Sequence, residues 1–291
     1  MNTAPPRLHP ITMPPSGDPV FSAMANISAA AAFFLLFAGG MVTSTGSGLS
    51  VPDWPLSFGT LNPPMIGGIF FEHGHRLFAG AVALMSAALA LAARRPNVHP
   101  AARRAAWLAA GGILIQAFLG GLTVLMKLPP AVSISHACLG QAVFCLLLAS
   151  SLLAKPGDAP AQSHGKIFRL AVLGFAAAYL QLILGALIRH AGTGLPWHIL
   201  WAVSVLVLAA LGCFASRKRP GLRGPAAFLA VTVLLQIGLG LFALRLRLDS
   251  TMVIGFQEAA AWRTAHLSGG ALTLAAFLLL AIKARPPKDS R

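Results

Sequence analysis

The feature that most constrains this chain is a series of eight apolar runs, each long enough to cross a lipid bilayer. They cover about residues 21–45, 73–94, 104–127, 133–154, 167–189, 197–215, 225–246 and 262–283. A helix of about 20 apolar residues spans the roughly 30 Å hydrocarbon core. An open strand cannot cross that layer, because its backbone polar groups would stay unpaired. The runs therefore predict an all-α integral membrane protein with eight transmembrane helices.

The composition agrees with this prediction. Hydrophobic residues make up 56% of the 291 residues and charged residues only 10%, which is too apolar for a soluble domain. The net charge of +15 would suit a nucleic-acid partner, but the basic residues fall in the gaps between the apolar runs. In that position they set the orientation of a membrane protein, so we expect no nucleic-acid binding.

The Lys and Arg residues are unevenly divided between the two sides of the predicted helices. Sixteen of the 22 lie on the side that carries both termini. The six on the other side are Arg76, Lys127, Arg189, Arg245, Arg247 and Arg263. Since cytoplasmic loops carry the excess of positive charge, both termini are predicted to be cytoplasmic.

Residues 1–20 contain six prolines and read as a disordered N-terminal tail. The tail lacks the organisation of a signal peptide, so we expect the first helix to remain as an anchor. The three cysteines, Cys138, Cys145 and Cys213, lie inside apolar runs. They predict small buried residues rather than a disulfide framework or a metal site.

A short pattern repeats along the chain. Glutamine and glycine four residues apart occur in the third, fifth and seventh runs, and a histidine follows near the start of the next run. The three sets are Gln116, Gly120 and His136; Gln181, Gly185 and His198; and Gln236, Gly240 and His266. The first hairpin has Leu35, the pair Gly39-Gly40, and His75. We interpret the glycines and glutamines as structural, because small residues let helices approach and amides bond across them.

The four repeated histidines indicate ligands near the outer face. A single histidine at a helix start is commonly a satisfied polar group, but one in each of four hairpins favours a shared role. Imidazole binds iron, copper and zinc, and two histidines facing across a gap suit the axial positions of a haem. Four would make two such pairs. His73 and His190, also near the outer face, could support these ligands from behind, but we favour their interpretation as surface residues.

Glu72-His73-Gly74-His75-Arg76 lies at the outer end of the second apolar run. Spacings of three and four residues put Glu72, His75 and Arg76 on one helix face, with His73 pointing elsewhere. Ionisable groups at the mouth of a membrane helix indicate function. A plain helix pair between Glu72 and Arg76 is the structural alternative.

The Glu72-x-x-His75-Arg76 motif, the four histidines and the loop Thr45-Gly-Ser-Gly-Leu-Ser-Val-Pro-Asp-Trp-Pro55 together resemble haem A synthases over nearly all of residues 21–284. The resemblance implies two pseudo-symmetric four-helix bundles, residues 21–155 and 156–285, related by a two-fold axis. It also implies oxidation of a methyl group of haem O to the formyl group of haem A by successive hydroxylations, for terminal oxidase assembly.

The resemblance also implies roles for single residues. His75 and His136 would bind the substrate haem, and His198 and His266 would hold a retained haem b. Glu72 matches an essential carboxylate, placed to fix the tautomer of His75 through a hydrogen bond and to accept protons. Candidate partners for haem propionates are Arg76, Arg189, Arg245, Arg247 and Arg263, although each also suits an ordinary interfacial arginine.

The resemblance places the protein in the cell (inner) membrane with its haem sites toward the outer face. Partners would include haem O synthase and an electron acceptor that the sequence does not name. Many members carry cysteine pairs in their outer loops, whereas loops 46–72 and 190–196 have none here. Four histidines alone would equally serve a di-haem b cytochrome that relays electrons from quinol, or a haem transporter; Glu72 and the outer loop favour the synthase.

Overall fold

The protein was analysed as a computed structural model, which describes residues 17–154, 164–249 and 254–286. These residues form eight helices, all long and apolar enough to span a membrane. They are α1 (Pro19–Ser44), α2 (Gly67–Ala92), α3 (Pro100–Leu125), α4 (Pro130–Leu152), α5 (Gly165–Ala191), α6 (Leu195–Ser216), α7 (Pro220–Leu248) and α8 (Phe256–Ala284). The prediction of an all-α membrane protein with eight transmembrane helices is confirmed.

The helices begin earlier than hydropathy indicates. α2 and α8 each start six residues before the predicted run, and α1 starts at Pro19, inside the predicted tail. The rest of that tail, residues 1–16, lies outside the described residues. Prolines stand in the first turn of five helices, where the missing N–H costs no hydrogen bond. Asp18 caps α1 by accepting the backbone N–H of Phe21 at 2.8 Å.

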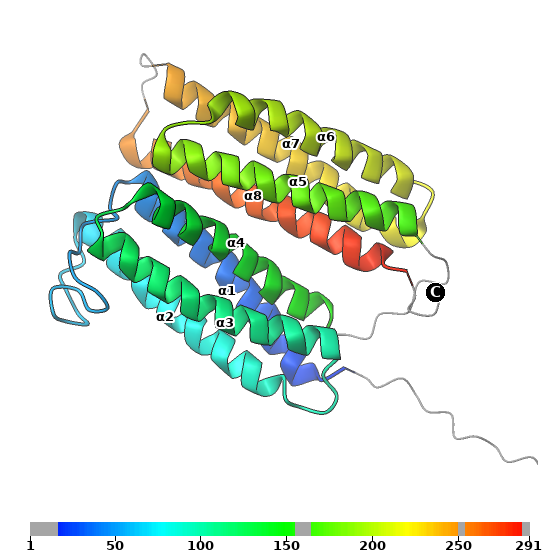
Figure 1. Cartoon of the computed structure of the whole chain (residues 1–291), viewed down its shortest axis with the longest axis horizontal. Coiled ribbons are helices and arrows are strands. Elements are labelled where there is room, and N and C mark those ends of the chain that lie inside the picture. Colours follow the sequence, from blue (N-terminus) through cyan, green and yellow to red (C-terminus); the bar gives the residue numbers. More distant parts are fainter. Residues whose placement is uncertain (1–16, 155–163, 250–253, 287–291) are drawn as a thin grey trace, which may run out of the picture.

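Consecutive helices pack as antiparallel hairpins, and these hairpins gather into two groups. α1 packs against α2 and α4, and α5 packs against α6 and α8. The groups α1–α4 and α5–α8 meet through α1 with α8 and α4 with α5, as Figure 1 shows. A two-fold relation between the groups stays a prediction.

Small residues and a few large side chains fill the interior. α8 is the most buried helix, and its Leu274, Phe277 and Leu280 are fully buried. The Phe277 ring lies against Gly174 of α5, where a side chain would collide with it. Large apolar side chains such as Leu84 and Leu114 are instead 75% and 72% exposed. Such surfaces are a liability in water but suit lipid.

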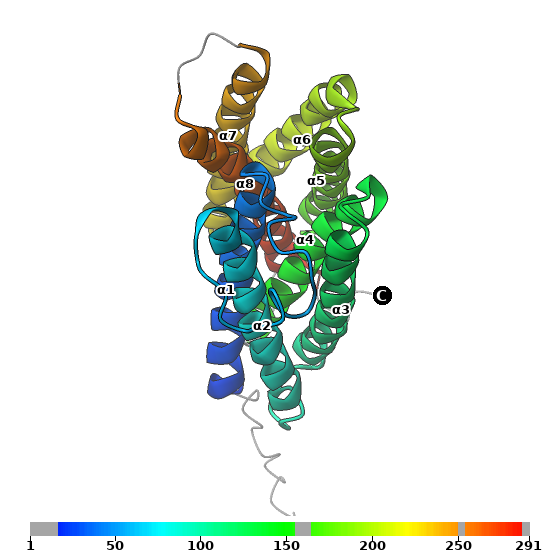
Figure 2. The ribbon, with the colours of Figure 1, turned by 90° about the vertical axis from the view of Figure 1, so that its left-hand side faces the viewer.

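The connection between α1 and α2 is folded over one end of the helices. In Figure 2 this loop, residues 45–66, crosses in front of the ends of α1 and α2. All four even-numbered helices start at this end, and each carries its repeated histidine within its first eleven residues, so the histidines lie toward the same end as the loop.

Candidate functional site

Each repeated histidine packs against a glycine of the preceding helix. The four pairs are Gly39 with His75, Gly120 with His136, Gly185 with His198, and Gly240 with His266. A methyl group on any of these glycines would lie only 2.9–3.3 Å from the nearest ring carbon, Cε1. The glycines therefore let the imidazole rings lie directly on the neighbouring backbone, which gives the sequence repeat its physical reason.

Two of the repeated glutamines bind the helices that carry the histidines. The side-chain amide of Gln116 donates to the carbonyl oxygen of His136 at 2.8 Å, and that of Gln181 donates to the carbonyl oxygen of His198 at 2.9 Å. The amide of Gln236 lies against Gly269 of α8. The expectation that these amides bond across helices is confirmed for the first two, which fixes the height of each histidine.

His198 and His266 face each other with ring centroids 6.3 Å apart and planes at 81°. A metal–imidazole nitrogen distance of about 2.0–2.1 Å, plus roughly 1.1 Å from that nitrogen to the ring centre, separates two trans ligands by about 6.3 Å. The observed spacing therefore fits two axial ligands of one iron. His198 Nδ1 lies 3.1 Å from the carbonyl oxygen of Gln181, the usual contact that orients a ligating imidazole.

His75 and His136 form the second pair, close enough for their charges to interact. Nδ1 of both rings is buried without a hydrogen-bond partner among the described residues. Buried polar atoms without partners are costly, which suits a site completed by a ligand. His190, at the end of α5, is half-buried and also interacts electrostatically with His136. Its position suits either of the two interpretations from the sequence, a surface residue or one that supports the histidine ligands.

The described residues hold no cluster of three or more His, Cys, Asp or Glu side chains that could bind a metal ion. Each histidine pair thus offers two protein ligands, which is the number that a haem takes from its protein, because the porphyrin supplies the rest. The residues present fit haem at both pairs.

Glu72 is buried, with 4% of its surface exposed, and both carboxylate oxygens are engaged. Oε1 accepts from Arg76 Nη2 at 2.6 Å, and Oε2 accepts from the backbone N–H of Val51 at 2.8 Å. The predicted pair on one helix face is confirmed. The expected hydrogen bond to His75 is absent among the described residues, where His75 Nδ1 has no partner.

His73 is equally buried, and the sequence did not indicate this. Its Nδ1 lies 2.7 Å from the hydroxyl oxygen of Ser57, which is fully buried in the outer loop. The interpretation of His73 as a surface residue was wrong, because the loop folds back and covers it.

The candidate arginines differ in what they contact. Arg76 donates to carbonyl oxygens of the outer loop as well as to Glu72. Arg189 of α5 reaches the other helix group and donates to the carbonyl oxygen of Gly40 at 2.7 Å and to Ser44 Oγ at 2.5 Å. Its Nε is buried without a partner among the described residues.

The remaining candidates are exposed. Arg245 pairs with Asp249 at 3.6 Å, with 65% of its side chain exposed, while Arg247 and Arg263 are exposed on α7 and α8. Arg263 lies close enough to Arg189 for their charges to interact. Of the five arginines, Arg189 thus best combines burial with a free donor.

The three cysteines lie within helices α4 and α6. Cys145 is buried, Cys138 and Cys213 are half-buried, and all three are free thiols. The prediction of small residues packed within helices agrees with these positions.

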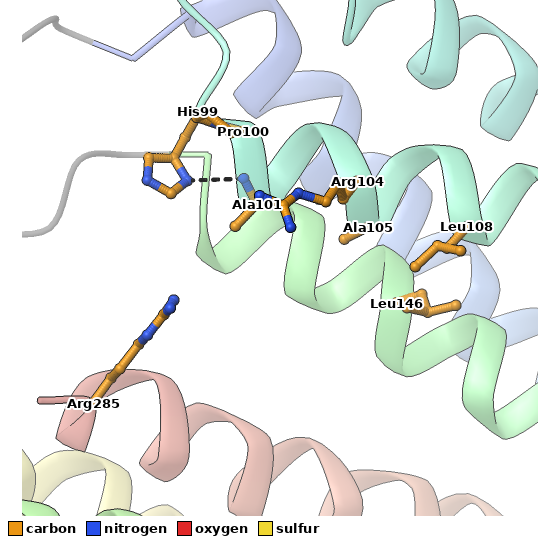
Figure 3. A pocket seen from close by; sticks show the side chains of 8 residues that line it. All are labelled: His99, Pro100, Ala101, Arg104, Ala105, Leu108, Leu146 and Arg285. Atoms are coloured by element: carbon orange, nitrogen blue, oxygen red, sulfur yellow. Dashed lines mark hydrogen bonds between the residues drawn. The ribbon is translucent and has the colours of Figure 1, made fainter. Parts of the chain in front are cut away.

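A surface pocket lies at the opposite end of the molecule from the histidines (Figure 3). It is formed by the start of α3 together with Leu146 of α4 and Arg285 after α8, and His99 Nδ1 there accepts the N–H of Ala101 at 3.2 Å. The site chemistry does not involve this pocket, because the paired histidines and Glu72 all lie at the other end.

Comparison with known proteins gives a family. The model of the cytochrome oxidase assembly proteins, COX15-CtaA, matches residues 67–198. That segment contains Glu72 and three of the four histidines. Over that segment the chain is similar to this family. A Bacillus licheniformis protein named haem A synthase is 27% identical over 178 residues, and one of the same name from Symbiobacterium thermophilum is 30% identical over 172.

These matches cover 58% of this chain and of the Bacillus protein, and 54% of this chain and 55% of the Symbiobacterium protein. The chain therefore spans little more than half the length of the curated relatives it matches.

Proposed function

We propose that this protein is a haem A synthase, an oxidoreductase that converts the methyl group of haem O to the formyl group of haem A by successive hydroxylations. The observation that carries the proposal is that a histidine packs on a glycine in each of the four hairpins, with the rings of His198 and His266 facing each other and His75 lying close enough to His136 for their charges to interact. The similarity of residues 67–198 to COX15-CtaA and the names of the matched relatives support the reaction class.

We assign the retained haem b to His198 and His266, whose rings, with centroids 6.3 Å apart, would hold its iron. When bound, that haem supplies one-electron redox chemistry. The substrate haem O is assigned to His75 and His136, which share the outer end with the loop and with Glu72. Arg189 is the favoured partner for a haem propionate, because its buried Nε still has a donor to offer.

In this proposal Glu72 accepts protons released from the substrate. Each of its oxygens has one neighbour in the structure and keeps a further lone pair for a proton. Arg76 and the N–H of Val51 orient the carboxylate, and burial shields it from competing water.

The distribution of basic residues supports an orientation with cytoplasmic termini and the histidines near the outer face of the cell membrane. Haem O synthase would supply the substrate, and an electron acceptor would remove the electrons.

The test is to express the chain with a source of haem O and to chromatograph the extracted haems. A haem carrying a formyl group is expected. Glu72→Gln should still fold and bind both haems, but turnover should fall by about 100-fold or more, with haem O or its singly hydroxylated form accumulating. A protein that holds two haems and never forms haem A would instead be an electron-relaying cytochrome.

A further inference from the structure

The outer loop is fastened to α2 mainly by Arg76. Nη1 donates to the carbonyl oxygens of Asp53 and Leu56, both at 2.7 Å, and Nη2 donates to that of Val51 at 3.2 Å and to Glu72 Oε1 at 2.6 Å. These bonds use all four terminal N–H groups of the guanidinium. Only Nε is left for a haem propionate, so the position of Arg76 favours a role in holding the loop.

Further contacts fix the loop at buried points. The N–H of Val51 donates to Glu72, and Ser57 meets His73; Val51 and Ser57 are both fully buried. The Asp53 carboxylate shapes the segment between them by accepting two backbone N–H groups of the loop, at 2.7 and 2.8 Å. The segment that begins with Asp53 is therefore held in one place above α2.

This segment carries Trp54 across to α3. A methyl group on Gly121 would lie 2.9–3.1 Å from three atoms of the indole, so the ring is packed on the backbone of α3. The preceding residue, Gly120, is the one on which the His136 ring lies. Trp54 is 40% exposed, so part of the indole is free on the surface. The rest packs on α3 at Gly121, next to the glycine that contacts His136.

We propose that Trp54 forms the outer wall of the substrate-haem site and that Arg76 is a positioning residue, which holds Trp54 there through the loop. This inference rests on the proposed function, since it takes His75 and His136 as the substrate pair. An aromatic wall packs well against a planar macrocycle and excludes water from it. The loop has no cysteine pair to make it rigid, and the hydrogen bonds of Arg76 hold it in place instead.

Trp54 is tested in the full-length protein carrying haem b, with haem O as the substrate. Trp54→Ala should raise KM for haem O about tenfold with a smaller change in kcat, because the ring binds substrate and takes no proton. Trp54→Phe should restore most of the affinity. Leu61→Ala is the matched control, since Leu61 is in the same loop and 71% exposed, and it should leave KM unchanged.

Arg76 is tested by Arg76→Lys, which keeps the charge but cannot reproduce four bonds in a planar fork. Cleavage of the loop by chymotrypsin, followed by mass spectrometry, should become about tenfold faster. KM for haem O should rise as it does in Trp54→Ala, and the haem b content should not change.

A wild-type KM in Trp54→Ala, or a loop that opens in Arg76→Lys without loss of haem O affinity, would overturn the inference. The protease measurement needs no turnover. If the wild-type protein neither binds nor oxidises haem O, the proposed function fails, and with it the role of Trp54, while the cleavage rates still decide whether Arg76 holds the loop.

Discussion

Gly240→Ala provides a sharp test of the histidine geometry, with a control two residues away. The new methyl group would lie 2.9 Å from Cε1 of His266. Carbon atoms prefer a separation of at least about 3.5 Å, so the ring would have to move by roughly 0.6 Å. Metal–ligand distances tolerate only about 0.2 Å. The same methyl group at Gly238 meets nothing within 4 Å.

Overpacking of this kind costs about 1–3 kcal/mol. If that cost falls on the haem-bound state, retention of haem b should weaken by about 5- to 150-fold in Gly240→Ala. Gly238→Ala should match the wild type. Gly185→Ala, where the contact to His198 is looser at 3.2 Å, should give an intermediate loss.

The assay is the pyridine haemochrome spectrum of purified protein, with circular dichroism to confirm equal helix content. The ratio of haem to protein should follow the order Gly238→Ala, Gly185→Ala, Gly240→Ala. Full haem b content in a folded Gly240→Ala protein would refute the reasoning that ring position is set by the glycine.

Three other predictions concern separate features. His198→Ala should abolish low-spin haem b in the purified protein, whereas His75→Ala should leave most of it, and equal losses measured by haemochrome spectra would argue against two distinct sites. Reporter fusions after Arg95 and after Asn62 should report opposite sides of the membrane; agreement between them would contradict the topology. Backbone hydrogen bonds from Gly59 and, second, from Phe58 hold the pKa of the Asp53 carboxyl below its ordinary value of 3.8. The ionised carboxylate therefore stabilises the folded loop at pH values above 3.8, and this stabilisation is lost as the pH falls through the lowered pKa. Pepsin should therefore cut the wild-type loop faster as the pH drops below about 3.8, while Asp53→Asn should be cut quickly throughout the acid range; a pH dependence that the substitution leaves intact would contradict this.

Local patterns in the sequence predicted most of the fold. Hydropathy located all eight helices, and helical spacing predicted the contact between Glu72 and Arg76. Hydropathy placed the start of α2 too late. Gly67, Gly68 and Glu72 lower the mean hydropathy of the first turns, although they are part of the helix. The repeat predicted four equivalent histidines. It did not show why the glycines recur, which is that each histidine ring packs directly on the backbone of a glycine.

Contacts that depend on the path of an irregular loop were not predictable. Nothing in the composition of residues 45–66 indicates that their carbonyl oxygens would converge on Arg76 or that His73 would be covered. The two bonds by which Arg189 reaches α1 were likewise not predictable. Such bonds arise from how the two groups of helices meet, which residue spacing does not encode.

The contacts of Arg76 and Arg189 also imply an order of assembly during synthesis. Arg76 binds partners only 4–25 residues before it, so the outer loop can close as soon as the first helical hairpin has crossed the membrane. Arg189 binds α1 across 145 and 149 residues and must wait until α5 has been made. The loop over His75 can thus be complete while the ribosome is still translating the half that carries His198 and His266.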